Sequence, residues 1–191
     1  MLAILGIGLG LIIGLVSRGS MRALASAEIP AAWTLVGLFA AQAAVRGPLF
    51  ESLGEMAIPL WGALLLVLLV VLWRPQMGAE LWACGLGLAA NLLVIIVNGH
   101  MPVVASAVLP PEEVSAAITR FGGFYRVAGP DTRLVWLGDI IPLGPGLASI
   151  GDVVLALGVA AYIVRIMHAP RRVRISPEGH KTGIDIHLSQ E

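Results

Sequence analysis

The most constraining feature of the sequence is a series of long apolar segments that contain almost no charged residues. A helix that crosses the hydrocarbon core of a bilayer needs about 20 mostly apolar residues. Five segments approach this length and composition, at residues 2–16, 30–45, 57–73, 81–97 and 150–167. We therefore expect an all-α polytopic membrane protein with about five transmembrane helices.

The composition supports a membrane protein and excludes two other classes. Hydrophobic residues make up 58% of the 191 residues and charged residues 13%, whereas soluble domains carry about 25% charged residues. Disordered chains combine low hydrophobicity with high charge. The twelve basic and twelve acidic residues cancel, which argues against a nucleic-acid partner. Membrane lipids are the expected partners.

Cysteine usage limits the possible cofactor sites. Cys84 is the single cysteine and lies inside an apolar run. A disulfide within the chain and a zinc site built on several cysteines are therefore excluded. We expect no metal site and no other cofactor.

The chain divides into a membrane domain over residues 1–168 and a polar, flexible tail over residues 169–191. Within the membrane domain, residues 134–147 are apolar but are broken by Asp139, Pro142, Gly144, Pro145 and Gly146. We interpret them as an outward-facing re-entrant or interfacial segment, because irregular backbone at membrane depth must be buried in protein or face water. A short amphipathic helix is predicted over residues 111–121, which begins after a proline and ends before two glycines.

Basic residues in the short loops predict the orientation, because they gather on the cytoplasmic side of a membrane protein. The first and third loops and the tail carry seven of them: Arg18, Arg22, Arg74, Arg171, Arg172, Arg174 and Lys181. This predicts a multi-pass protein of the cytoplasmic membrane with its N-terminus outside and its C-terminus in the cytoplasm. Residues 1–17 could instead be a signal peptide cleaved near Ala27, but they contain no basic residue before the apolar run.

Two stripes of small residues predict helix packing. Gly6, Gly10 and Gly14 recur at every fourth position of the first span, and Ala83, Gly87 and Asn91 form a similar stripe on the fourth. Such stripes allow helices to approach closely in lipid. We expect the first stripe to face the fourth or fifth span, with a homodimer contact as the alternative.

A few polar residues lie at the expected outer ends of the spans and are the candidates for function, because polar groups at membrane depth are costly. Asp139 and Asp152 are the candidate catalytic residues. Asn98, His100 and Gln42 are the candidate ligand-binding residues, and Asn91 lies deeper in the fourth span. Together they predict a polar pocket that opens outward.

Each candidate except Asp139 also has a structural interpretation. Asn98 before Gly99 is typical of a helix C-terminus, and Ser149 three residues before Asp152 resembles a capping box. His100 could meet the last carbonyls of a helix, and Gln42 could bond to a neighbouring helix. No local cap explains Asp139.

Two neighbouring carboxyl groups could also form a catalytic dyad, since one of them would keep a proton while the other acts as a base. In this respect Asp139 and Asp152 resemble the two aspartates of signal peptidase II, an aspartic protease of bacterial membranes. That resemblance implies cleavage of a lipid-anchored or membrane-embedded substrate at the outer surface. The Asn-x-x-Asp-Arg stretch of that family is absent from this chain.

Three ordered motifs resemble a second family. They are Asn98-Gly99-His100-Met101-Pro102-Val103, Leu137-Gly138-Asp139-Ile140-Ile141-Pro142 and Ser149-Ile150-Gly151-Asp152-Val153. They are similar to the signature of a bacterial membrane family designated domain of unknown function 5317. The resemblance covers most of residues 1–168 and implies a multi-span protein of the bacterial cytoplasmic membrane, without implying an activity.

Three functional classes therefore remain open. The first is a binding or accessory membrane protein whose outer polar site holds a ligand, a lipid-linked molecule or a membrane-embedded partner. The second is the aspartyl-dyad hydrolase, and the third is a small transporter or channel subunit, since acids within a membrane also mark ion paths. The distance and bonding of Asp139 and Asp152 should separate the first two classes.

Overall fold

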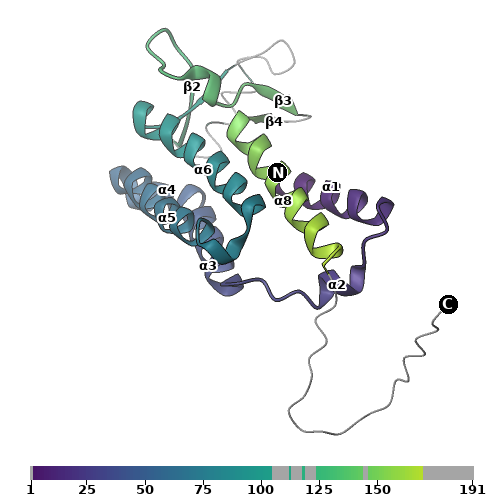
Figure 1. Cartoon of the computed structure of the whole chain (residues 1–191). Helices are drawn as coiled ribbons and strands as arrows, with labels where there is room; N and C mark the ends of the chain where they lie inside the picture. Colours follow the sequence, from purple (N-terminus) through teal and green to yellow (C-terminus); the bar gives the residue numbers. More distant parts are fainter. Residues whose placement is uncertain (1, 105–111, 113–117, 119–123, 144–145, 170–191) are drawn as a thin grey trace, which may run out of the picture.

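The computed structural model describes residues 2–104, 112, 118, 124–143 and 146–169, and they are mostly helical (Figure 1). The α-helices are α1 (Leu2–Val16), α2 (Met21–Ala25), α3 (Ala32–Arg46), α4 (Phe50–Leu53), α5 (Ala57–Leu72), α6 (Ala79–Asn98) and α8 (Ile150–Met167). The 3-10 turns are η1 (Gly54–Met56), η2 (Pro75–Met77) and η4 (Val135–Leu137), and the strands are β1 (Met101–Val103), β2 (Tyr125–Val127), β3 (Ile141–Leu143) and β4 (Gly146–Ala148). The predicted tail after Ala169 and the predicted helix over 111–121, apart from Glu112 and Ile118, lie outside the described residues.

Within the described residues, three helical segments are long and apolar enough to cross a membrane: Phe50–Leu72, Ala79–Asn98 and Ile150–Met167. The first joins α4, η1 and α5 into one segment of 23 residues. Helices α1 and α3 match two further predicted spans but contain 15 residues each. At a rise of 1.5 Å per residue such a helix is about 22 Å long, which is less than the hydrocarbon thickness of about 30 Å.

Helix α1 packs closely against α8, as its glycine stripe predicted. A β-carbon on Gly6 would lie 2.5 Å from the carbonyl oxygen of Ala156, and one on Gly10 would lie 2.8 Å from that of Ala160. Only glycine permits this approach of the two backbones. The contacts advance together along both chains, so α1 and α8 run parallel.

Helices α6 and α8 pack antiparallel through a second set of small residues. A β-carbon on Gly87 would overlap the carbonyl oxygen of Gly151, and one on Gly158 would lie 2.6 Å from the Cys84 sulfur. The two helices therefore lie side by side along their length, with the C-terminal end of α6 beside the N-terminal end of α8 (Figure 1).

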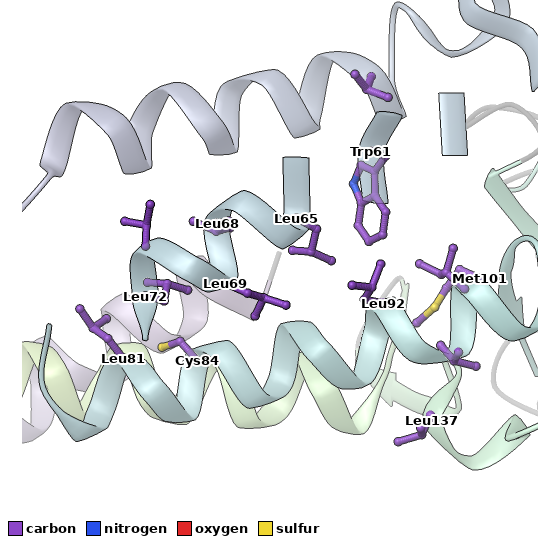
Figure 2. Packing of buried hydrophobic residues seen from close by; sticks show 14 of the residues in the cluster. Trp61, Leu65, Leu68, Leu69, Leu72, Leu81, Cys84, Leu92, Met101 and Leu137 are labelled. Carbon is purple, nitrogen blue, oxygen red and sulfur yellow. The ribbon is translucent and has the colours of Figure 1, made fainter. Parts of the chain in front are cut away.

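Larger side chains fill the space between α5 and α6. Leu65 and Leu68 of α5 are fully buried, and Leu69 and Leu72 lie beside Leu81 and Cys84 of α6 (Figure 2). Helix α3 packs on the other side of α5. The structure thus combines a glycine-lined contact of α1, α8 and α6 with a leucine-rich contact of α6, α5 and α3.

Short strands cover the end where α6 finishes and α8 begins (Figure 1). β1 and β2 pair in parallel, and β3 and β4 form an antiparallel pair. The described part of segment 134–147, which was predicted to be re-entrant or interfacial, contains the 3-10 turn η4, strand β3 and the start of β4. The all-α prediction missed these strands because three residues are too few to show an alternating pattern.

Candidate functional site

The C-terminus of α6 is closed by Asn98 and Gly99. Gly99 has a φ of 70°, the left-handed conformation that glycine adopts at a helix end. The Asn98 Nδ2 group donates to the Val94 carbonyl at 2.8 Å and to the Arg133 carbonyl at 2.9 Å, and Asn98 Oδ1 accepts from the Arg133 backbone amide at 2.9 Å. One donated bond thus stays within α6, and the two bonds with the Arg133 backbone fix the loop before η4.

The N-terminus of α8 carries the predicted capping box. The Ser149 hydroxyl accepts from the Asp152 backbone amide at 2.9 Å, and the Asp152 carboxylate accepts from the Ser149 amide. The Asp152 carboxylate also accepts from Asn91 Nδ2 at 2.9 Å, and the Ser149 hydroxyl donates to Asn91 Oδ1 at 2.8 Å. Asp152, Ser149 and Asn91 therefore form a closed network that joins α8 to α6.

Asp139 lies between η4 and β3 and is held by its backbone. Its amide donates to the Pro102 carbonyl at 2.9 Å, and its own carbonyl accepts from the Val104 amide at 3.0 Å. These bonds attach the segment to β1 as a parallel bridge between Asp139 and Val103. The position of the side chain is thereby fixed by main-chain bonds on both sides.

The Asp139 side chain is buried and incompletely bonded. The residue is 8% exposed, and among the residues that the structure describes its carboxyl oxygen Oδ1 has no hydrogen-bond partner. A buried polar atom without a partner costs about 1–3 kcal/mol, so such atoms are few in native proteins. The contacts of the described residues therefore leave Asp139 Oδ1 unexplained.

Burial raises the pKa of Asp139 to about 8, and the nearby charge of Asp152 acts in the same direction. The guanidinium of Arg46 partly opposes this shift and lowers the pKa. Asp139 is therefore mostly uncharged at neutral pH. The charge of Asp152 thus acts on Asp139, but the two carboxyl groups differ in bonding: Asp152 accepts from Asn91, whereas Asp139 Oδ1 meets no partner among the described residues.

Tyr125 and Arg46 belong to the same cluster, although they were not among the predicted site residues. Burial raises the pKa of Tyr125; Arg46 lowers it, and the charges of Asp139 and Asp152 raise it. The Arg46 Cζ atom lies 6.0 Å from the centroid of the Phe124 ring. These residues come from the end of α3 and from the start of β2, more than 75 positions apart in the sequence. No local pattern could have associated them.

Two predicted ligand-binding residues lie outside this network of bonds. His100 is half-buried, and burial together with the charge of Arg126 lowers its pKa. Gln42 is buried on α3, and its Nε2 group has no hydrogen-bond partner. Gln42 and Arg46 lie one turn apart on α3, so the same helix carries both side chains.

Among the residues that the structure describes, no group of three or more His, Cys, Asp or Glu side chains could hold a metal ion. The arrangement offers a buried carboxyl group with a raised pKa, a hydrogen-bonded carboxylate and an exposed guanidinium at one end of the helices. Such a set can donate and accept hydrogen bonds and can pair with an anionic group.

Comparison with known proteins returns one family. The model described as "Family of unknown function (DUF5317)" matches residues 26–164, which include the Asn98, Asp139 and Asp152 motifs and exclude α1. No curated protein and no solved structure matches the chain. The resemblance to signal peptidase II gains no support from these comparisons.

Proposed function

The chain belongs to the DUF5317 family, and we propose that it is an integral membrane protein with a binding or accessory role, whose ligand or partner contacts Asp139. One observation carries this proposal: the Asp139 carboxyl is buried and yet leaves Oδ1 without a partner. A polar ligand or a side chain of a membrane partner would supply the missing bond.

The binding role is favoured over catalysis by the bonding of Asp152. Its carboxylate accepts from Asn91 and from the helix cap of α8, which accounts for its presence without any reaction. A residue that closes a helix cap and joins two helices is expected to stay fixed. Asp139 then acts alone, as a hydrogen-bond donor to an acceptor atom of the ligand.

The aspartyl hydrolase is the second candidate, and the mutual influence of the two acids supports it. Asp139 is held protonated partly by the charge of Asp152, and unequal carboxyl groups are what acid–base catalysis requires. In this alternative, Asp139 would protonate the leaving group. The transporter has less support, since Glu80 and Asp152, the acids of α6 and α8, lie in the first turns of those helices.

The proposed topology has five spans, with the site on the outer face of the bacterial cytoplasmic membrane. The parallel course of α1 and α8 and the antiparallel course of α6 and α8 agree with alternating spans. A cysteine at Asp131, beside the strands, should react with a membrane-impermeant maleimide added outside cells, and one at Ser26, before α3, should not. The reverse pattern would place the site in the cytoplasm.

A hydrophobic carbodiimide tests the binding site, because it modifies protonated carboxyl groups in apolar surroundings. We expect modification of Asp139 in detergent-purified protein and slower modification in native membranes, where the ligand or partner is present. Asp152 should react poorly in both. Peptide mass spectrometry measures both sites, with Asp131→Asn as a control that removes an exposed acid. Equal, slow modification of Asp139 in both samples would show a sealed carboxyl and would overturn the proposal.

A further inference from the structure

A groove runs along the contact between α5 and α6. It has a volume of about 380 Å³ and is lined almost entirely by apolar residues, among them Pro59, Trp61, Gly62, Leu92, Ile95 and Gly99. The missing side chain of Gly62 leaves part of the space open. A β-carbon there would contact only Leu92, at 3.6 Å, so a larger residue could enter the groove without moving the backbone.

The surroundings of the groove indicate what fills it. Leu66 and Ile96, which also line it, are 54% and 65% exposed. Both belong to helical segments that are long and apolar enough to cross a membrane. In a bilayer these exposed faces meet acyl chains. Lipid tails are as apolar as leucine, so a preference for one lipid must come from its headgroup.

Two aromatic rings connect the groove wall to a cation. The Trp61 ring, which forms part of the wall, lies 5.1 Å from the Phe124 ring, and Arg46 lies on the same Phe124 ring at 6.0 Å. One aromatic ring thus separates the groove wall from an exposed guanidinium. Arginine pairs with phosphate oxygens through two parallel hydrogen bonds.

The same cation connects the groove to the polar site, since the charge of Arg46 acts on both Asp139 and Tyr125. An apolar groove and a polar cluster that share one arginine fit a molecule with a tail and a charged headgroup. Charge complementarity therefore favours a lipid with an anionic headgroup, because the exposed Arg46 guanidinium is a cation.

We propose that the ligand of this protein is a glycerophospholipid, with one acyl chain in the α5–α6 groove and its phosphate on Arg46. This inference rests on the proposed binding function and names the ligand class of that site. The rest of the headgroup then lies on the Asp139 side of the Trp61 and Phe124 rings.

Photo-crosslinking with two lipid probes tests this assignment. The full-length protein in nanodiscs receives phosphatidylglycerol or diacylglycerol, each with a diazirine in the acyl chain, and mass spectrometry locates the modified peptides. We expect phosphatidylglycerol to modify residues 58–66 and 92–99 about tenfold more than diacylglycerol, the scale of one charge-assisted contact. Equal modification by the two probes would overturn the inference.

Two variants separate the groove from the cation. Gly62→Leu should fill the groove and abolish the modification, whereas Gly37→Leu, on α3 with open space around it, should leave it unchanged. Arg46→Gln should lower modification by phosphatidylglycerol to the diacylglycerol level. Arg46 is exposed, so Arg46→Gln should fold. It therefore still tests the phosphate contact if Gly62→Leu does not fold. Unchanged modification in Arg46→Gln would contradict the phosphate contact.

The outcomes also separate this inference from the proposed function. Carbodiimide modification of Asp139 without any lipid in the groove would retain the binding site and reject the phospholipid. A crosslink from the groove to a second protein chain would assign it to a protein interface and would also reject the phospholipid. A sealed Asp139 beside a lipid-filled groove would reject the polar site alone.

Discussion

The two ends of the α6–α8 pair satisfy their polar groups in different ways. At the end where α6 begins, Arg165 Nε pairs with the Glu80 carboxylate at 3.0 Å, and its guanidinium lies 5.0 Å from the Tyr162 ring centroid. There Glu80 Oε2 has this ion pair but no hydrogen bond to another described residue. At the opposite end, the Asp152 carboxylate accepts from Asn91, whereas Asp139 Oδ1 has neither an ion pair nor a hydrogen bond within the described part of the chain. The first arrangement stabilises the fold, and the second leaves a bond to be made with another molecule.

The largest effect should follow from breaking the helix contact that holds both ends in place. In Gly10→Leu the side chain would meet the backbone of Ala160, which cannot move aside without separating α1 from α8. We expect a loss of about 3 kcal/mol or of folding altogether, the upper range for overpacked contacts. Gly8→Leu is the matched control, because a β-carbon there has open space. The yield of monodisperse protein in detergent measures both, and equal tolerance would show that α1 does not pack on α8.

The next largest effect should be on the pH dependence of stability, through Asp139. Its pKa of about 8 in the folded protein lies above the ordinary value of 3.8, so the folded state binds the proton more tightly than the unfolded state. Stability from this group is fully present below about pH 4 and is lost as the pH rises through 8, by the order of 1 kcal/mol per pH unit. Asp139→Asn imitates the protonated acid and should remove this dependence. Thermal unfolding between pH 5 and pH 9 measures this dependence. If the unfolding temperature changes with pH equally in the wild-type protein and in Asp139→Asn, the result counts against a protonated Asp139.

A smaller effect is expected at the well-bonded acid. Asp152→Asn weakens the capping box of α8 and should cost about 1 kcal/mol, as the loss of a helix cap usually does. If Asp152 is only structural, the variant keeps carbodiimide modification of Asp139. Thermal unfolding and peptide mass spectrometry give both readouts. Loss of the same binding activity in Asp139→Asn, Asp152→Asn and the double variant, with no further loss in the double, would instead favour a dyad.

The smallest effect should occur at the opposite end, where His168 joins α8 to α1. Its Nδ1 lies 2.9 Å from the Val164 carbonyl and its Nε2 lies 3.0 Å from the Ser17 carbonyl, so both nitrogens donate only in the protonated ring. Both bonds raise the pKa of His168, and the bond to the Ser17 carbonyl has the larger effect. Their stabilisation is present below pH 6.5 and is lost as the pH rises through the raised value.

Hydrogen exchange at the Ser20 amide, which donates to the Met167 carbonyl at 2.7 Å, reports on this junction. His168→Gln should speed exchange at pH 6 by about two- to threefold, because one charged contact at a helix C-terminus is weak when exposed. An equal change at pH 6 and pH 9 would exclude a role for the protonated ring.

Sequence reasoning succeeded where a local pattern has one structural meaning. The bounds of α8 were predicted at residues 150–167, and Ser149 with Asp152 predicted its cap. The glycine stripe predicted the α1–α8 contact, because small residues at every fourth position serve close approach in lipid. Asn98 with Gly99 likewise predicted the end of α6.

The remainder depends on residues that are distant in the sequence. Arg46 and Tyr125 meet Asp139 only through the packing of α3 and β2, and neither shows a motif of its own. The groove arises from the missing side chain of Gly62 opposite Leu92, which hydropathy does not reveal. Asn98 was a predicted ligand-binding residue, but its side-chain amide donates both of its hydrogen bonds to backbone carbonyls. Its position in the sequence could not distinguish this structural role from ligand binding.

The protonation state of Asp139 tests the proposed site most directly, because it follows from the burial of the carboxyl group. Infrared difference spectroscopy, with Asp139→Asn as the reference, isolates the carbonyl band of a protonated carboxyl group. The structure predicts that this band is present at pH 7 and disappears as the pH rises through about 8. A band that is already lost near pH 4 would show an ordinary, solvated carboxylate and would contradict the proposed site.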